Sequence, residues 1–277
     1  MSNSSKCEGC RGGAAFPIPF SMAFQPIVSV ADGSIASHEA LVRGVGGEGA
    51  GSILGAVNAE TRYAFDQACR VKAISLASSL GISTRLSINF MPNAIYDPAA
   101  CIRLTLATAR KHALPLEALT FEITEDERIG DFGFMRGIIT EYRRHGFRIA
   151  LDDFGAGFAG LNTLLELQPD IVKFDRTLIS GIDSDLRKRT LTTGMMALCR
   201  DMGISITAEG VETEGELAAL IDAGVSHVQG YLLARPAFEK LVRREELGWQ
   251  PDRAGRSQPP HCVGAELLIP LPPRTPS

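Results

Sequence analysis

One short pattern repeats along most of the chain. A β-prone apolar run is followed by a polar residue, then by an amphipathic stretch of helical length, then by a glycine of the kind that ends helices. Strands that alternate with helices pair in parallel through right-handed crossovers, so the pattern predicts an α/β fold. The predicted strands are Met22–Val28, Ile35–Leu41, Arg85–Asn89, Leu119–Ile123, Arg148–Asp152, Ile171–Phe174, Ile204–Ala208 and His227–Gln229. The glycines that end the predicted helices are Gly81, Gly146, Gly203 and Gly224.

The first two predicted strands are joined differently from the rest. Only Val30-Ala-Asp-Gly33 and its neighbours separate them, which is a hairpin turn signal and predicts an antiparallel pair. Eight strands in a chain of this length then predict a TIM-like (β/α)8 barrel with an antiparallel first strand pair. An open, doubly wound sheet is the alternative that the same pattern allows.

The two ends of the chain differ from the middle in composition. Residues 1–17 are rich in Ser, Gly and basic residues and predict a flexible leader, while the Pro-rich residues 249–277 predict an extended tail. Residues 18–248 remain as the folded domain. Cys7 and Cys10 form a CxxC in the leader, but no second pair follows at zinc-site spacing. An incidental leader and a metal or redox role both remain open.

Charge and cysteine use point to a cytoplasmic enzyme or regulator. The net charge of −4 argues against a protein that binds nucleic acid through a broad basic face. We find no signal peptide and no apolar run long enough to span a bilayer, so no membrane association is expected. Cys69, Cys101 and Cys199 fall in predicted helices without a pairing pattern, as expected of reduced, buried thiols.

Two adjacent carboxylates mark a candidate site. Asp152 and Asp153 end the fifth predicted strand and run directly into a glycine-rich segment. Two like charges side by side repel each other unless a cation lies between them, and a hard divalent ion with oxygen ligands is the usual cation. The glycines that follow let the backbone bend so that both side chains can converge. Taken alone, the pair could equally be a solvated turn or a helix cap.

The barrel prediction extends this site, because the active sites of barrel enzymes lie at the C-terminal ends of the strands. Any one polar residue there could be a surface acid, but nearly every predicted strand end carries an oxygen donor. The side chains at or just beyond these ends are Glu39, Asn89, Glu122, Glu125, Asp152, Asp153, Lys173, Asp175, Glu209, Glu212 and Gln229.

The same residues carry a resemblance to a known family. The sequence resembles, over about residues 20 to 245, the EAL domain family of cyclic di-GMP-specific phosphodiesterases in bacterial signalling. The motifs, in family order, are Gln25-Pro26, Glu39-Ala-Leu-Val-Arg43, Ser87-Ile-Asn89, Phe121-Glu-Ile-Thr-Glu125, Asp152-Asp-Phe-Gly155, Lys173-Phe-Asp175, Glu209-Gly-Val-Glu212 and Gln229-Gly-Tyr231. The segment Tyr63-Ala-Phe-Asp-Gln-Ala-Cys-Arg70 also looks like the second-helix segment of the family.

The resemblance implies a set of metal ligands. Glu39, Asn89, Glu122 and Asp152 would hold a first ion, and Asp152 would bridge to a second. The second ion would also be bound by Asp153, with Glu209 nearby as a ligand or through water. Carboxylate and amide oxygens suit two Mg²⁺ or Mn²⁺ ions, which can activate a water molecule and stabilise charge on phosphoryl oxygens. Ca²⁺ is expected to bind and inhibit, because it is larger and less demanding in geometry.

The resemblance also implies roles for the other residues. Lys173 would orient or deprotonate the attacking water, or serve as an ion-pair partner of the acids, and both roles could hold together. Asp175 would position Lys173 and contact the substrate. The catalytic set would be Lys173, Glu39, Glu209, Asp152 and Glu125. The substrate contacts would be Gln25, Leu41, Arg43, Asn89, Asp175, Glu212 and Gln229.

Glu125 is expected to steady the loop Phe154–Leu161, which couples metal binding and dimerisation to activity in the family. Here the loop has Phe and Ala where Thr, Tyr and Ser are common, which could alter its dynamics without removing catalysis. The expected protein is therefore a homodimeric, metal-dependent hydrolase that opens cyclic di-GMP to linear pGpG. Its rivals are a cyclic di-GMP receptor that turns over slowly and acts through a protein partner, and a phosphodiesterase for another diester.

Overall fold

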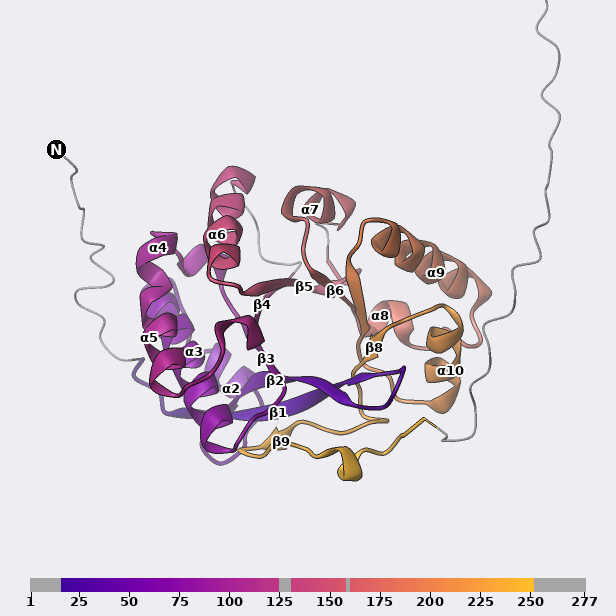
Figure 1. Cartoon of the computed structure of the whole chain (residues 1–277), viewed down its shortest axis with the longest axis horizontal. Coiled ribbons are helices and arrows are strands. Elements are labelled where there is room, and N and C mark those ends of the chain that lie inside the picture. Colours follow the sequence, from indigo (N-terminus) through magenta and orange to yellow (C-terminus); the bar gives the residue numbers. More distant parts are fainter. Residues whose placement is uncertain (1–15, 125–130, 158–159, 252–277) are drawn as a thin grey trace, which may run out of the picture.

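Eight strands close into a barrel in the computed structural model, which describes residues 16–124, 131–157 and 160–251 (Figure 1). The ring runs in the order β2, β3, β4, β5, β6, β7, β8, β1 and closes through the β1–β2 pair. The strands are β1 (Phe20–Ser29), β2 (Ile35–Gly44), β3 (Arg85–Asn89), β4 (Leu119–Thr124), β5 (Arg148–Phe154), β6 (Ile171–Phe174), β7 (Ser205–Ala208) and β8 (His227–Val228). This confirms the predicted barrel over the open sheet. Most of the predicted leader and of the predicted tail, residues 1–15 and 252–277, lies outside the described residues.

The antiparallel start of the barrel follows from the turn between β1 and β2. Gly33 has a φ of 66°, a left-handed conformation that suits glycine, and the backbone N–H of Ser29 donates to the carbonyl of Ser34 across the turn. β1 pairs antiparallel with both of its ring neighbours, β2 and β8. All the other ring neighbours pair in parallel, as predicted.

Several strand bounds differ from the prediction, and the largest difference is in β2, which continues to Gly44 so that Glu39 lies within the strand rather than near its end. β5 continues to Phe154 rather than ending at Asp152, because its pairing with β6 shifts register between Leu151 and Phe154. A ninth strand, β9 (Ala237–Phe238), was not predicted, since two residues carry no periodicity. It pairs antiparallel with the middle of β1.

Helices surround the strands on most sides of the barrel (Figure 1). They are α2 (Gly51–Leu54), α3 (Arg62–Ser79), α4 (Pro98–Cys101), α5 (Arg103–Lys111), α6 (Phe132–Arg144), α7 (Gly160–Leu167), α8 (Arg176–Ile179), α9 (Leu186–Asp201) and α10 (Glu214–Asp222). Side-chain caps fix several starts: Asp131 begins α6, Asp185 begins α9, and Thr213 with Glu216 forms a capping box at α10. The four predicted helix-ending glycines all have positive φ, between 74° and 87°.

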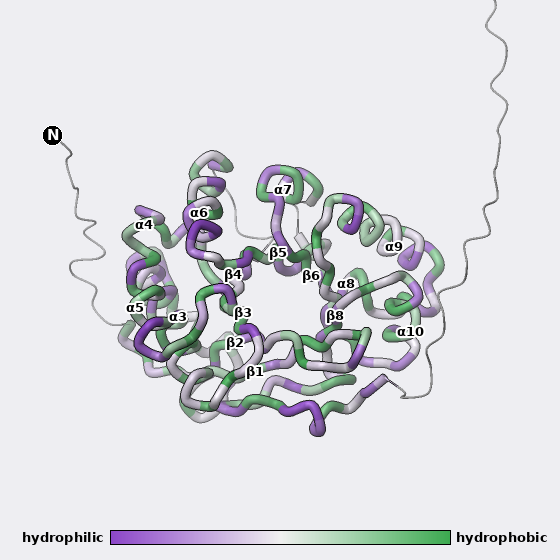
Figure 2. The backbone as a smooth tube through the Cα atoms, viewed as in Figure 1, coloured by the Kyte–Doolittle hydropathy of each residue, from purple (hydrophilic) through white to green (hydrophobic). Residues whose placement is uncertain are grey.

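The apolar core lies between the strands and the helices and divides into two clusters. One joins β1 to β4 with α3, α5 and α6, and the other joins β5 to β8 with α9 and α10. Hydrophobic and hydrophilic residues alternate along α6, α7 and α9 (Figure 2), as in helices that pack one face on a sheet. On the side of β1, the strand β9 and the chain after it lie where a helix would otherwise be (Figure 1).

Cys69, Cys101 and Cys199 are free, buried thiols in α3, α4 and α9, as predicted. Burial raises the pKa of the Cys199 thiol to about 11, so it stays protonated at neutral pH. Within the described ranges, the helices are all too short or too polar to cross a bilayer.

Candidate active site

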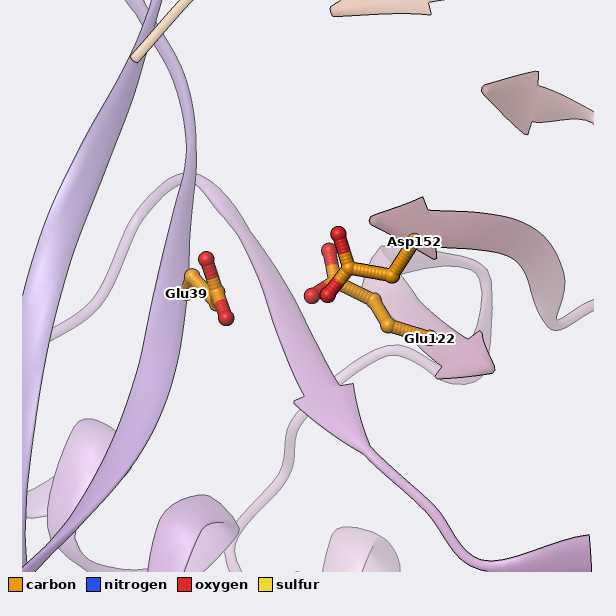
Figure 3. Close-up of side chains that lie close together, drawn as sticks. All are labelled: Glu39, Glu122 and Asp152. Carbon is orange, nitrogen blue, oxygen red and sulfur yellow. The ribbon is translucent and has the colours of Figure 1, made fainter. Parts of the chain in front are cut away.

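Acidic side chains meet at the end of the barrel where the parallel strands finish. Glu39 comes from β2, Glu122 from β4 and Asp152 from β5, and the three carboxylates point toward one another (Figure 3). All three are buried. Glu39 and Asp152 line an open cavity of about 440 Å³, together with Asn89, Asp153, Glu209 and Gln229.

Lys173 of β6 lies at the centre of this acidic cluster. Its Nζ is 3.2 Å from Glu39, 3.0 Å from Glu122 and 3.0 Å from Asp152. The Glu209 carboxylate at the end of β7 is nearer still, at 2.6 Å. The lysine side chain is 1 % exposed, so water does not screen these contacts. The Lys173 ammonium group therefore forms ion pairs with four acids, each carried by a different strand or by the residue just after it.

Asp152 and Asp153 converge through the backbone of β5 itself. Asp153 has a φ of 54°, which is uncommon for a residue with a side chain, and it lies within the register shift of the strand. Its N–H donates to Oδ1 of Asp152 at 3.0 Å. Oxygen atoms of Asp152, Asp153 and Glu209 lie within 4.8 Å of one another. The bend thus begins at Asp153 and continues at Gly155, the first of the glycines singled out in the sequence, which has a φ of 98°.

Three amide side chains, from β1, β3 and the residue after β8, form a hydrogen-bond network around Glu39 of β2. Asn89 donates to Oε1 of Glu39 at 3.0 Å, and Gln229 donates to its Oε2 at 2.8 Å. Gln229 also donates to Gln25, which in turn donates to the Ala234 carbonyl at 3.0 Å. Oε1 of Gln229 is buried and has no hydrogen-bond partner. A buried oxygen of this kind is available to a bound group.

Most acids of the cluster have a raised pKa, caused first by their burial and then by the neighbouring carboxylates. Burial, reinforced by neighbouring carboxylates, raises the pKa of Glu122, Asp152 and Glu209 despite Lys173. Burial and then Asp152 raise the pKa of Asp153 to about 6. Burial works against the charge of Glu39 too, but Lys173, Gln229 and Asn89 together lower its pKa.

The same acids stabilise the charged form of Lys173. Burial alone would lower the pKa of its ammonium group, but Asp152, Glu122, Glu209 and Glu39 together raise that pKa well above the ordinary value. The lysine is therefore a cation in this arrangement. The single positive charge cannot balance five carboxylates.

The donor set fits divalent metal ions. Two groups of acids offer converging oxygens, Glu39 with Glu122 and Asp152, and Asp152 with Asp153 and Glu209. Asp152 belongs to both groups. In the described part of the chain these groups contain no His or Cys, so the chemistry suits a hard cation such as Mg²⁺ or Mn²⁺.

The remaining predicted site residues fall into three places. Leu41, Asp175 and Glu212 line the cavity beside the acids. The Asp175 carboxylate caps α8 by accepting from the Thr177 N–H at 2.8 Å. Arg43 is not among the lining residues, and its guanidinium donates to the carbonyl of Val42 in its own strand. Glu125 lies outside the described residues.

The structure adds cavity residues to which sequence reasoning assigned no role. Thr124 ends β4, and Arg176 directly follows Asp175 and pairs with Glu212 at 2.9 Å. Tyr231 stands two residues beyond Gln229. All three are neighbours in sequence of residues that were singled out. The signal available in the sequence was their position just beyond a strand end or within the same short motif.

The family model described as "EAL domain" matches residues 19–236. The chain belongs to the EAL domain family. The match spans all eight strands of the barrel and every acid of the cluster described above.

Solved structures of EAL proteins share this fold. A standalone EAL protein from Vibrio cholerae O395, solved with cyclic di-GMP bound, is 47 % identical, with a TM-score of 0.80. The comparison covers 82 % of this chain and 96 % of that one. BlrP1 from Klebsiella pneumoniae, solved with manganese and cyclic di-GMP, is 33 % identical with a TM-score of 0.76, over 80 % of this chain and 57 % of that one.

Among curated proteins, the EAL chain is 34 % identical over 152 residues to the probable cyclic di-GMP phosphodiesterase PdeA of Escherichia coli. That stretch covers 55 % of this chain and 21 % of PdeA. The matched region is about a fifth of the length of PdeA and just over half of the length of the next curated relative.

Proposed function

We propose that this protein is a metal-dependent phosphodiesterase that hydrolyses cyclic di-GMP to linear pGpG in bacterial second-messenger signalling. The observation that carries the proposal is the excess of buried carboxylates around Lys173 at the mouth of an EAL barrel. The standalone Vibrio cholerae protein, which has almost the same extent as the matched region, binds cyclic di-GMP in its solved structure. A cytoplasmic location would place the enzyme where this messenger acts.

Two Mg²⁺ or Mn²⁺ ions would be held by the acid cluster and would supply charge neutralisation and an activated water molecule. Glu39, Asn89, Glu122 and Asp152 are the candidate ligands of the first, and Asp152 and Asp153 of the second, with Glu209 beside them. The raised pKa values of Glu122, Asp152 and Glu209 support this, because added positive charge would let these buried acids ionise. We also propose that Ca²⁺ binds here and inhibits.

Lys173 would orient or deprotonate the attacking water. Its pKa is raised because four carboxylates surround it, so it begins as a charged donor that can orient a water oxygen. With those carboxylates partly neutralised by metal ions, the upward shift of the Lys173 pKa would weaken and the amine would be a better proton acceptor. Hydrolysis to pGpG adds this water across one phosphodiester and releases a ribose 3′-hydroxyl.

The other cavity residues would hold the cyclic dinucleotide. Leu41, Asp175, Glu212 and Gln229 already line the cavity, and Gln25 lies among them. Arg43 would have to leave the Val42 carbonyl in order to reach a phosphate or a guanine edge. We also propose that Glu125 steadies the loop after β5. The protein would form a homodimer beside that loop.

The test is product analysis with purified protein, cyclic di-GMP and Mg²⁺ or Mn²⁺. We expect metal-dependent pGpG that disappears in Asp152→Ala. Asp201→Ala is the matched control, because Asp201 is an exposed aspartate at the end of α9, outside the cavity. Equal turnover in wild type and Asp152→Ala would overturn the site.

Two other functions give different results in the same assay. A receptor that acts through a partner would bind cyclic di-GMP tightly and release no pGpG. A phosphodiesterase for another diester would hydrolyse a generic diester in preference to cyclic di-GMP. A substrate panel therefore separates all three.

A further inference from the structure

The side chain of Arg176 joins two neighbouring strand ends of the barrel. Arg176 begins α8 just after β6, and its side chain reaches the segment that follows β7, residues 209–212. One terminal nitrogen of its guanidinium donates to the carbonyl of Gly210, and the other donates to the Glu212 carboxylate at 2.9 Å. Because one planar group makes both contacts, it fixes the segment relative to the end of β6.

The backbone at Gly210 fits the stem of this arginine. Gly210 has a φ of 65°, a left-handed conformation that suits glycine. A Cβ added there would lie 2.7 Å from Cβ and 2.9 Å from Cγ of Arg176, so the stem lies directly against the glycine backbone. The chain therefore bends at Gly210 in close contact with Arg176.

The residue just before this bend is Glu209, whose carboxylate belongs to the acid cluster. Its backbone N–H donates to the Phe174 carbonyl of β6 at 2.9 Å, and its carboxylate pairs with Lys173 at 2.6 Å. On the other side of the segment, the N–H of Val211 donates to the Gln229 carbonyl at 3.1 Å. The segment that carries Glu209 is thus held between β6 and the chain after β8, and Arg176 contributes on the β6 side.

Arg176 also lines the cavity, where a guanidinium could bind a phosphate directly. Both of its terminal nitrogens, however, already donate to Gly210 and Glu212. The contacts on the page therefore favour a role in holding the protein over a role in binding the substrate.

We propose that Arg176 is a positioning residue, which holds residues 209–212 so that the Glu209 carboxylate faces the oxygens of Asp152 and Asp153. The inference rests on the proposed function, since it concerns the metal ions that the reaction would use. A residue that orients a metal ligand from outside commonly contributes about ten- to a hundredfold to metal affinity or activity. An exposed ion pair contributes little to stability, so a loss of metal affinity would reflect orientation and not unfolding.

The positioning role predicts a graded effect on metal binding. Arg176→Ala should weaken Mn²⁺ binding and lower kcat by about tenfold each. The KM for cyclic di-GMP should stay within about twofold of wild type, because no substrate contact is removed. Arg176→Lys keeps a positive charge near Glu212 but lacks the fork that also reaches Gly210, so its losses should be about threefold.

Calorimetric titration of the metal-free protein with Mn²⁺, without substrate, is the main measurement. Steady-state kinetics and denaturant titration accompany it, and the denaturation midpoint should not change. The matched control is Arg189→Ala, since Arg189 is 42 % exposed like Arg176, pairs with Asp222 at 3.5 Å and does not line the cavity. We expect wild-type Mn²⁺ affinity and kcat in this control.

Unchanged Mn²⁺ affinity in Arg176→Ala would overturn the positioning role, and a rise in KM alone would point to a direct substrate contact instead. Equal losses in Arg176→Ala and Arg189→Ala would overturn it as well, since the effect would not depend on the cavity. A wild-type protein that binds Mn²⁺ but does not cleave cyclic di-GMP would overturn the proposed function, while the Mn²⁺ affinities would still decide the role of Arg176.

Discussion

The barrel contains two buried clusters of charge that differ in balance. Asp66 and Arg70 in α3 form an ion pair at 2.7 Å with both side chains fully buried. Lys173 instead pairs with Glu39, Glu122, Asp152 and Glu209, and Asp153 lies beside the last two of them. One cluster pairs one acid with one base, and the other shares a single cation among five acids.

Several neighbours surround the balanced pair, although Nε of Arg70 is buried and has no hydrogen-bond partner. Arg70 donates to the Tyr142 hydroxyl at 2.8 Å and lies over the rings of Phe90, Phe121 and Tyr142. Asp66 accepts from the Met91 N–H at 3.0 Å. A buried charge with this many protein partners has a structural role. The contrast teaches that burial of charge alone does not mark a functional site, whereas an uncompensated excess of one sign does.

Asp152→Asn should separate activity from stability most strongly. The variant removes one negative charge shared by both oxygen groups, so turnover should fall by roughly a thousandfold or more. The free energy of unfolding should change by no more than about 1 kcal/mol, since three other acids still surround Lys173. Product analysis and chemical denaturation measure the two effects. Retained turnover would show that the acid excess serves another purpose.

Asp66→Ala should do the reverse. It leaves Arg70 buried without its carboxylate, and the free energy of unfolding should fall by roughly 3–5 kcal/mol. The kcat of the fraction that remains folded should be close to that of the wild type, because Asp66 does not line the cavity. Denaturant titration and an assay at low temperature provide the readouts. A variant as stable as wild type would contradict the assignment of a structural role.

Metal addition should stabilise only through the unbalanced cluster. Mn²⁺ at about 100 times its Kd should raise the free energy of unfolding by about 2.7 kcal/mol, since a ligand of the native state stabilises it. Asp152→Asn should lose most of this gain, while Asp66→Ala should keep it. Thermal denaturation with and without a chelator measures the effect. We expect Ca²⁺ to stabilise as well, but without supporting turnover.

Glu216 refines the comparison, because it is a buried acid that backbone donors satisfy, with a smaller contribution from the charge of Arg176. Its carboxylate accepts from the N–H groups of Gly181, Glu212 and Thr213. These bonds outweigh the effect of burial and lower its pKa below the ordinary 4.5. Glu216→Gln should reduce the free energy of unfolding by roughly 1–3 kcal/mol near neutral pH.

The pH dependence of this difference has a fixed sign. A carboxyl whose pKa is lower in the folded protein stabilises it fully above the unfolded pKa, and the stabilisation is lost as pH falls through the folded pKa. The difference between wild type and Glu216→Gln should therefore be largest above about pH 4.5 and shrink in acid. Denaturant titrations at several pH values measure it. A difference that grows in acid would refute the assignment.

Much of the fold was readable because the sequence repeats a local pattern. Alternating apolar runs and amphipathic stretches determine strands and helices, and the turn at Asp32 and Gly33 determines the antiparallel start. β9 escaped prediction because its two residues are held by pairing with β1 rather than by their own pattern. The extension of β5 to Phe154 escaped for a similar reason, since the register shift exists only against β6.

For the site, the sequence by itself determined which residues stand at strand ends and that nearly all of them are oxygen donors. Only the tertiary structure decided how they meet. It placed Lys173 among four carboxylates, bent the chain at Asp153, and set Arg176 against Gly210. The physical reason is that side-chain identity is local, whereas charge balance and pKa depend on distances between strands far apart in the chain, which exist only once the barrel closes.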